Sequence, residues 1–275
     1  MRVRFDAEAG GRLSSVEVHG WELLSRDKVD LFHWGNFVIA PWVGRLRHGV
    51  LRFEGAEHRF PINAAPHAVH GLVTQRPWRA ERPGVLTIDF GAPWPWRGRL
   101  THEVTLYPDR LEHRLTLEAH EPMPAAMGWH PWFPRTITGP DGATAGPIEI
   151  DVEPGLMYAH DDEGIPSGTL VSPPPRPWDY CFRDLSAAPR VRWPGALEIE
   201  IESDCSHWVI YDRDPGAVCV EPWTGPPNSL NIPSPRVVLP GEPLTAEIDV
   251  VLASARLTRT PVASHAAGGP VSARA

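Results

Sequence analysis

The chain has 275 residues and a net charge of −8, with no run of Lys or Arg. This charge pattern argues against a nucleic-acid-binding protein or one that binds anionic membranes, so we expect neither partner. The 32 Pro and 24 Gly are spread along the whole chain and divide it into many short elements, which argues against long helices.

The N-terminus, Met1 to Asp6, has no apolar segment typical of a secretory signal. No run of about 18 apolar residues is present, so we expect no membrane-spanning helix. The three cysteines, Cys181, Cys205 and Cys219, have no metal-like spacing and are interpreted as reduced, buried thiols. These features together predict a soluble cytoplasmic protein.

Alternating apolar and polar residues predict strands at intervals along the chain. Residues 85–90 form the first clear candidate, and 100–107 with 110–118 predict a hairpin that turns at Pro108-Asp109. Further strands are predicted at 196–202, 207–211 and 245–252. The acidic residues that alternate with Leu and Ile in 196–202 are interpreted as a solvent-facing side of a sheet.

Many short antiparallel strands predict an all-β fold, a sandwich or a barrel. We expect one domain over residues 1–253, with a Pro-dense extended connector at 173–178. The small and polar composition of residues 254–275 predicts a disordered C-terminal tail. No long exposed apolar element is apparent, which favours a monomer or a weak dimer.

Arg45, in the segment Gly44-Arg45-Leu46-Arg47, is the first candidate binding residue. A guanidinium group suits paired hydroxyls or a carboxylate, and the alternative is a surface salt bridge. His67 and His70 stand three apart before a glycine. That spacing leaves them on opposite faces of a strand with no third ligand nearby, so a hydroxyl contact is favoured over a metal site.

His130 lies in the segment Gly128-Trp129-His130-Pro131-Trp132-Phe133. Its imidazole suits proton transfer near pH 7, and the alternative is a core histidine bonded to a backbone carbonyl. Asp179, before Tyr180, is a candidate acceptor for two hydroxyls or, alternatively, a turn cap.

Glu221 follows the apolar run 217–220 and precedes Pro222-Trp223-Thr224-Gly225. A carboxylate at the end of a strand is held rigidly yet open to a ligand, and burial would raise its pKa toward neutrality. The alternative is a buried pair with Arg236. One Glu and two aromatic-flanked His make a suitable acid and base set for chemistry near neutral pH.

Taken in order, these segments resemble the aldose 1-epimerase (galactose mutarotase) family. The resemblance runs from the Gly10-Gly11-Arg12 turn to about residue 253. It rests on five motifs in the family's order. They are an Arg followed by a short step to Gly, a loop with His before Gly, a central His before aromatic residues, an Asp shortly before a Phe, and a Glu-Pro pair near the end of the chain. In this chain those motifs are 44–49, 69–72, 130–133, 179–182 and 221–228.

The resemblance implies a large antiparallel β-sandwich with an open carbohydrate cleft. It also implies that Glu221 takes the proton from the anomeric O1 hydroxyl and that His130 protonates the ring oxygen O5. Arg45, His70 and Asp179 would hold ring hydroxyls of a small sugar. The implied reaction needs no metal and no organic cofactor, because it consists of paired proton transfers.

The chain departs from the family pattern at Gly44 and Leu72, and Pro131 and Trp132 make the His130 segment bulkier. Gly44 stands where the family has Asn, and Leu72 stands where it has a second Gly. Substrate identity therefore stays open, and the alternatives are a hexose-6-phosphate 1-epimerase and a non-catalytic sugar-binding or sensor protein. The phosphate alternative would use basic residues at the cleft, for which Arg76, Arg79, Arg97 and Arg99 are the candidates.

Overall fold

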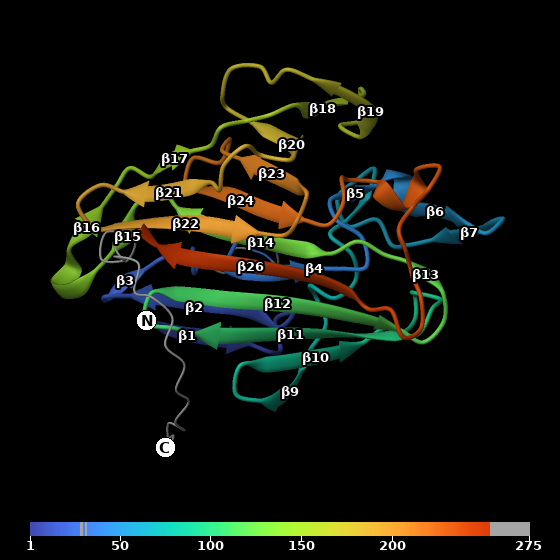
Figure 1. Cartoon of the computed structure of the whole chain (residues 1–275), viewed down its shortest axis with the longest axis horizontal. Coiled ribbons are helices and arrows are strands. Elements are labelled where there is room, and N and C mark those ends of the chain that lie inside the picture. Colours follow the sequence, from blue (N-terminus) through green and yellow to red (C-terminus); the bar gives the residue numbers. More distant parts are fainter. Residues whose placement is uncertain (28–29, 31, 254–275) are drawn as a thin grey trace, which may run out of the picture.

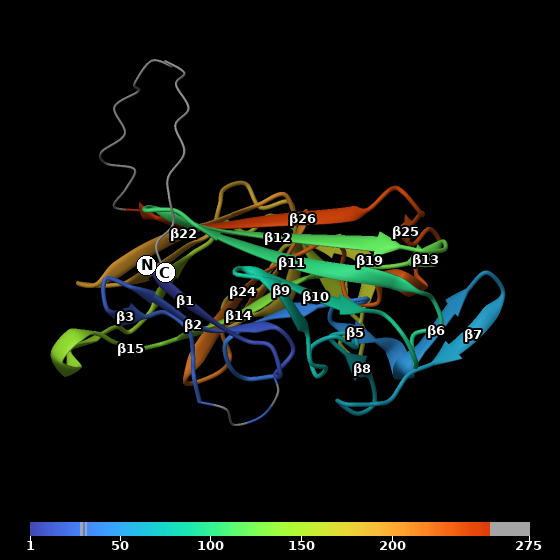
Figure 2. The same cartoon turned by 90° about the horizontal axis from the view of Figure 1, so that it is seen from below.

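A computed structural model describes residues 1–27, 30 and 32–253. The tail predicted at 254–275 lies outside the described residues. Two large sheets face each other as layers of a β-sandwich, which Figure 2 shows edge-on with β26, β12 and β11 above β14 and β24. The predicted all-β antiparallel fold is confirmed.

The ten-stranded sheet carries most of the candidate site residues, and its order is β1-β2-β4-β14-β24-β23-β20-β18-β19, with β3 paired to β2 (Figure 1). Its strands are β1 (Arg2–Asp6), β2 (Arg12–Val18), β3 (Trp21–Glu22), β4 (Asn36–Ile39), β14 (Gly128–Pro134), β18 (Met157–His160), β19 (Pro166–Val171), β20 (Asp179–Arg183), β23 (His207–Tyr211) and β24 (Ala217–Trp223).

The eight-stranded sheet forms the other layer, in the order β17-β21-β22-β26-β12-β11-β10-β9. Its strands are β9 (Arg79–Arg82), β10 (Val85–Asp89), β11 (Gly98–Leu106), β12 (Arg110–Ala119), β17 (Glu149–Asp151), β21 (Arg190–Trp193), β22 (Leu197–Ser203) and β26 (Leu244–Leu252).

Four two-stranded ribbons and three 3-10 helices complete the described elements. The ribbons pair β5 (Arg45–Leu46) with β8 (Ala68–Val69), β6 (Val50–Phe53) with β7 (Ala56–Arg59), β13 (Met123–Pro124) with β25 (Val237–Val238), and β15 (Ile137–Thr138) with β16 (Thr144–Ala145). The 3-10 helices are η1 (Arg47–Gly49), η2 (Pro140–Gly142) and η3 (Ser229–Asn231). Ribbons β5–β8 and β6–β7 lie together at one end of the sandwich (Figure 2).

The predicted strands are present within two or three residues of their expected ends. The hairpin β11–β12 turns after Leu106 pairs with Leu111, and alternate residues of both strands are buried. The same alternation along β26 places Leu244, Ala246 and Ile248 in the core between the sheets. The alternation of apolar and polar residues along each of these strands therefore decides which side chains face the core between the sheets.

Two local expectations need correction. The acidic face of β22 is not uniformly solvated, because Glu200 is only 6% exposed and its Oε2 lies 3.4 Å from Nε of Arg190. Strand β24 does not end at Glu221 but continues to Trp223, so the carboxylate lies inside the sheet and is 1% exposed.

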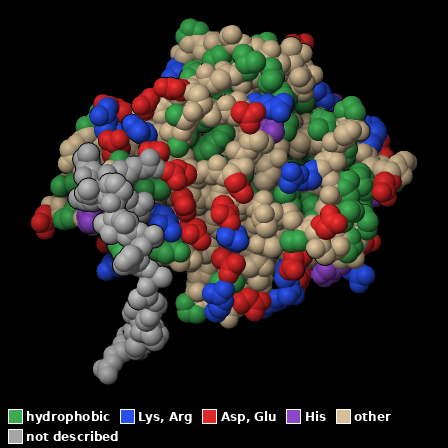
Figure 3. Space-filling model, viewed as in Figure 1, with side chains coloured by type: hydrophobic (Ala, Val, Ile, Leu, Met, Phe, Trp, Pro, Cys, Tyr) green, Lys and Arg blue, Asp and Glu red, His purple; other side chains and the backbone are tan. Residues whose placement is uncertain are grey.

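The outer face of the eight-stranded sheet mixes charges of both signs (Figure 3). Ion pairs join strands there: Arg114–Glu247 at 2.5 Å joins the neighbours β12 and β26, and Arg82–Glu103 at 2.6 Å joins β9 and β11 across β10. In the described part of the chain, no helix has the length and apolar character needed to cross a membrane.

Candidate active site

The register of the ten-stranded sheet brings His130 and Glu221 together. Strands β14 and β24 pair Gly128 with Trp223 and Trp132 with Cys219, so His130 lies opposite Glu221 midway between these pairs. Directly opposite residues of antiparallel strands point to the same face of the sheet. The acid and base candidates therefore share one face, and Nε2 of His130 lies 3.5 Å from Oε2 of Glu221.

The same register continues across β23 and β20. Val209 pairs with Glu221 and Cys181 pairs with Val209, while the neighbouring row contains Tyr211 and Asp179. These side chains form the floor and one wall of a cavity of about 480 Å³, within the ~300–1,000 Å³ range of small-molecule pockets.

His130 is buried between two aromatic rings. Phe37 stacks on one side with ring centroids 4.7 Å apart, and Trp132 stacks on the other at 5.2 Å. Its Nδ1 has no hydrogen-bond partner among the described residues. The alternative of a core histidine bonded to a backbone carbonyl therefore does not describe this side chain, which lines the cavity.

Glu221 is likewise not part of an arginine pair. Its Oε2 has no hydrogen-bond partner in the described part of the chain, and the residue facing it is His130. Arg236, the alternative partner, accepts a backbone hydrogen bond from Ala125 on another segment. The carboxylate thus has capacity to accept a hydrogen bond from a ligand in the cavity.

Arg45 and His70 reach the cavity from the ribbon β5–β8. Arg45 pairs with Val69, and the backbone N–H of His70 donates to the carbonyl of Gly44 at 3.0 Å. Gly71 follows with φ +72, and a Cβ there would lie 1.9 Å from the carbonyl oxygen of Ala40. Only glycine fits this contact, which fixes the His-Gly step beside the cavity.

His70 completes the inner group of polar side chains. Its ring centroid lies 5.0 Å from that of His130, and its Nδ1 has no partner among the described residues. Opposite it, Asp179 Oδ2 lies 3.6 Å from Arg45 Nη2, and both side chains are about one-third exposed. All five candidate residues, Arg45, His70, His130, Asp179 and Glu221, line this one cavity.

Burial sets the ionisation of the inner group. It raises the pKa of Glu221 well above its ordinary value of 4.5, and the charge of Asp179 adds to this effect. It lowers the pKa of His130 well below 6.5, with a further contribution from His70. The pKa of His70 falls to about 3 because of burial and the positive charge of Arg45. A neutral His70 can donate a hydrogen bond to an oxygen in the cavity.

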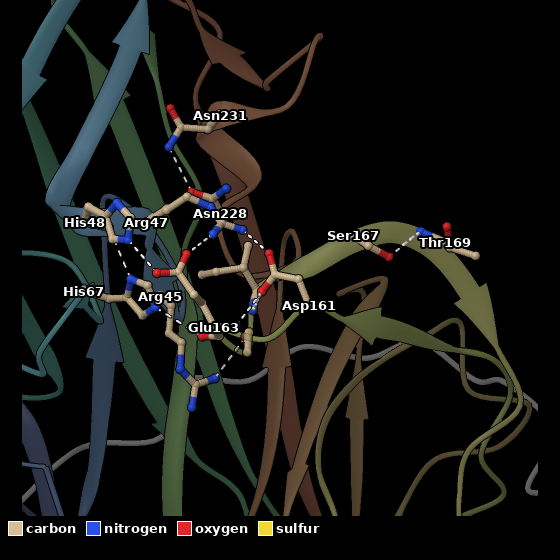
Figure 4. A network of polar contacts seen from close by, with 12 residues as sticks. Arg45, Arg47, His48, His67, Asp161, Glu163, Ser167, Thr169, Asn228 and Asn231 are labelled. Atoms are coloured by element: carbon tan, nitrogen blue, oxygen red, sulfur yellow. Dashed lines mark hydrogen bonds and ion pairs between the residues drawn. The ribbon is translucent and has the colours of Figure 1, made fainter.

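A polar network fastens the turn between β18 and β19 to the cavity rim (Figure 4). Arg47 contacts the carboxylates of Asp161 and Glu163, and His48 Nε2 lies 2.7 Å from Glu163 Oε1. We call residues 161–165 the strap. Glu163 and the neighbouring His160 line the cavity, and sequence reasoning missed both.

His67 belongs to this network rather than to a metal site with His70. Its Nδ1 accepts from the backbone N–H of His48 at 3.2 Å, and its Nε2 contacts the carbonyl oxygen of Glu163 at 3.1 Å. Both ring nitrogens are therefore engaged. His67 and His70 both line the cavity, although their spacing predicted opposite faces of a strand.

The two departures from the family pattern have visible surroundings. A Cβ at Gly44 would lie 2.9 Å from the ring of Pro227 and 3.1 Å from Trp223, so these residues occupy the space beside it. Leu72 is half-buried against the core, and its backbone N–H donates to Ala40 at 2.7 Å.

The four arginines considered for a phosphate lie elsewhere. None of them is among the residues that line the cavity, and each contacts an acidic side chain or a carbonyl group, as Arg99 does with Asp89 at 2.8 Å. The contacts of the other three are Arg76 with the carbonyl of Asp89, Arg79 with Glu81 and Arg97 with Glu121.

Comparison with known proteins adds independent support for the fold and the family. The family profile described as aldose 1-epimerase matches residues 7–249. The chain belongs to the aldose 1-epimerase family. The uncharacterized protein YihR of Escherichia coli K12 is similar to it, with 32% identity over 250 residues that cover 81% of this chain and 80% of that protein.

Solved structures of the aldose 1-epimerase family share the fold. A galactose mutarotase-like protein from Clostridium acetobutylicum superposes with a TM-score of 0.76 at 16% identity, covering 91% of both chains. A putative aldose 1-epimerase from Escherichia coli K12 gives 0.74 at 18% identity, covering 91% of this chain and 94% of that one. A galactose 1-epimerase from Lactobacillus acidophilus gives 0.70 at 13% identity, covering 91% and 90%.

Proposed function

We propose that this member of the aldose 1-epimerase family is a mutarotase that interconverts the α and β anomers of a free aldose. The observation that carries the proposal is the buried His130–Glu221 pair on the floor of an open cavity, with Nε2 and Oε2 3.5 Å apart. Among the described residues, neither Nδ1 of His130 nor Oε2 of Glu221 has a hydrogen-bond partner. A binding protein needs no matched acid and base, whereas ring opening needs both.

In the proposed reaction the carboxylate of Glu221 takes the proton of the O1 hydroxyl while His130 gives a proton to O5. The C1–O5 bond breaks and a free aldehyde forms. Rotation about C1–C2 turns the other carbonyl face toward O5, and the reverse proton transfers close the ring. Each positioned group contributes roughly 10²–10⁴-fold.

The burial of the pair supports this cycle. Before ring opening the pair is Glu⁻ with HisH⁺, and afterwards it is GluH with neutral His. Both states hold one proton, so the net charge of the buried pair does not change during the reaction. The raised pKa of Glu221 makes its carboxylate a stronger base, and the lowered pKa of His130 makes its protonated form a stronger acid, so both transfers of the opening step run downhill from Glu⁻ with HisH⁺. The same shifts favour GluH with neutral His in the empty site, so the proton has to move from Glu221 to His130 before the ring opens.

The polar side chains around the pair suit a neutral polyol. The lining includes three carboxylates, of Glu163, Asp179 and Glu221, and Arg45 is the one Lys or Arg among the described residues that line the cavity. Arg45 faces Asp179 at 3.6 Å. We therefore favour a free sugar over a hexose 6-phosphate, with Arg45, His70 and Asp179 holding hydroxyl groups.

The test is polarimetry of freshly dissolved α-D-glucose and α-D-galactose with wild type, His130→Asn and Glu221→Gln. We expect acceleration by the wild type alone, and calorimetry should show that Glu221→Gln still binds the sugar. Glucose 6-phosphate in the same assay examines the phosphate alternative. Sugar binding without acceleration by the wild type would instead support a non-catalytic sugar sensor.

A further inference from the structure

Cys219 lies beside the catalytic pair, and the proposed reaction does not use it. It precedes Glu221 by two residues on β24, so both side chains point to the same face of the sheet. The ligand atoms of His130, Cys219 and Glu221 all lie within 4.8 Å of one another. The three residues are 7%, 0% and 1% exposed.

We propose that His130, Cys219 and Glu221 form a binding site for a thiophilic divalent cation of the zinc class, and that this cation excludes the sugar from the catalytic pair. Cation binding rests on the geometry alone. Only the competition with sugar rests on the proposed function.

The spacing of the three side chains suits tetrahedral coordination. With Zn–N and Zn–O bonds of about 2.0–2.1 Å, two such ligands of a tetrahedron lie about 3.3 Å apart. The nitrogen of His130 and the oxygen of Glu221 are already 3.5 Å apart. With a Zn–S bond of about 2.3 Å the sulfur should lie about 3.6 Å from each. Because all three ligand atoms lie within 4.8 Å of one another, the sulfur has to approach by at most about 1.2 Å. A change in the side-chain torsion of Cys219 provides a movement of this size.

The site also has a polar atom that needs a partner and an open position. Glu221 Oε2 is buried and has no hydrogen-bond partner in the described part of the chain. His130 and Glu221 line the cavity, so the fourth position of a bound cation would face solvent. This arrangement of three protein ligands and one open position is the form in which zinc binds water or a small ligand.

Coordination releases protons to solvent in a defined number. The His130–Glu221 pair holds one proton and the Cys219 thiol holds another, and the cation binds neutral imidazole, carboxylate and thiolate. Two protons therefore leave for each cation bound. Because one ligand is sulfur and one is imidazole, the site favours Zn²⁺, Cd²⁺ or Co²⁺ over Mg²⁺ and Ca²⁺, which prefer oxygen ligands.

The chain offers a matched control in Cys181. Its thiol is buried and it also lines the cavity, but it is not part of the three-residue group. Co²⁺ is titrated into three metal-free full-length proteins: the wild type, Cys181→Ser and Cys219→Ser. The sulfur-to-cobalt charge-transfer absorption in the near ultraviolet is recorded for each. The mutarotation rate is then measured in increasing Zn²⁺ at two sugar concentrations, with Mg²⁺ as a comparison.

We expect wild type and Cys181→Ser to show the sulfur–cobalt band at one equivalent, and Zn²⁺ to inhibit both less at the higher sugar concentration. Cys219→Ser should lack the band and should need at least roughly 10–100-fold more Zn²⁺ for inhibition. Removing a residue that only orients a metal ligand already lowers metal affinity by this factor, so removing a ligand itself should cost at least as much. Cys219→Ala repeats the measurement if the Ser variant does not fold.

A sulfur–cobalt band that persists in Cys219→Ser, or is lost equally in Cys181→Ser, would overturn the site. Zn²⁺ that accelerates the wild type, or inhibition that sugar does not relieve, would overturn the competition. The cobalt band is read without any sugar, so metal binding is decided even if the tested sugars prove not to be substrates.

Discussion

At the scale of single residues, the number of protons on His130 and Glu221 decides what the cavity can do. In the proposed reaction the pair holds one proton. A second proton would have to charge His130, whose pKa burial lowers well below 6.5. Loss of the only proton would ionise Glu221 beside a neutral imidazole, and burial raises that pKa well above 4.5. The one-proton state is therefore the main form at every pH between the lowered pKa of His130 and the raised pKa of Glu221.

We accordingly predict a broad plateau in kcat/KM against pH. The acid limb reports protonation of His130 and should lie well below pH 6.5. The alkaline limb reports ionisation of Glu221 and should lie well above pH 4.5, with the plateau between the two limbs. Polarimetric kcat/KM for a free aldose, measured from acid to alkaline pH, checks this. An acid limb centred near pH 6.5, as for an exposed imidazole, would contradict the assignment of His130 as the buried partner.

Asp179 gives a second, independent readout. Its negative charge is a contributor to the raised pKa of Glu221. In Asp179→Asn that pKa should fall, so the alkaline limb should move to lower pH while KM for sugar rises through the lost hydroxyl acceptor. The control is Asp89→Asn, which removes a surface carboxylate that faces Arg99 outside the cavity. An alkaline limb that stays in place in Asp179→Asn would show that the limb does not report Glu221.

At the scale of elements, the strap joins parts of the chain that are far apart in sequence. Arg47 on η1 contacts Asp161 and Glu163 from the β18–β19 turn, and the Arg47 guanidinium lowers the pKa of Asp161 to about 2. These side chains are about one-third exposed, so ion pairs of this kind contribute only about 0–1 kcal/mol to stability. Their effect should be on the position of Glu163 at the cavity rim.

We predict that Arg47→Ala raises KM several-fold and changes kcat little, while the free energy of unfolding falls by less than about 1 kcal/mol. Polarimetric kinetics and urea unfolding measure the two effects. Hydrogen exchange over residues 161–165 should become faster. Arg52→Ala is the matched control, because its partner Glu57 lies on the β6–β7 ribbon and neither residue lines the cavity. Equal kinetics for the two variants would mean that the strap does not shape the site.

The sequence predicts some parts of this site and not others for physical reasons. Alternation along β11, β12 and β26 reports burial directly, so these strands are predictable from local pattern. His130 and Glu221 stand out because aromatic residues flank the first and a Pro/Gly-rich break follows the second. Glu163 and His160 have the same residue types, so residue type alone does not single them out. The place of the strap at the cavity depends on contacts of Glu163 with Arg47 and of the Gly164 carbonyl with Arg45, more than 100 residues away.

At the scale of the whole molecule, several histidines are buried as neutral groups. His102 and His113 lie in the core on β11 and β12, with Nε2 of one 3.2 Å from Nδ1 of the other and the indole N–H of Trp129 3.4 Å from Nε2 of His102. Burial lowers the pKa of His102 to about 3 and that of His113 well below 6.5. Such groups take up protons when the chain unfolds.

The sign of the effect follows from this uptake. Between pH 6.5 and about 3 the unfolded chain binds more protons at His102 than the folded chain does, so stability falls as pH falls. Above pH 6.5 both states carry neutral imidazole and the contribution is complete. Glu221 acts in the opposite direction, because its raised pKa lets the folded state retain a proton above pH 4.5. Six of the described histidines have a lowered pKa, so together they outweigh the single effect of Glu221. They are His70, His102, His113, His130, His160 and His207.

We therefore predict that the free energy of unfolding decreases from pH 7.5 to pH 5, and that His102→Asn reduces this slope below pH 6.5. The reduction should approach about 1.4 kcal/mol per pH unit, the value for one proton, as the imidazole of the unfolded chain becomes fully protonated. The slope is the readout because the substitution also lowers stability at every pH by disturbing a buried contact. Urea unfolding at several pH values provides the measurement, with His120→Asn, whose side chain is exposed, as the control. If His102→Asn keeps the wild-type slope, the core histidines do not take up the protons that destabilise the fold in acid.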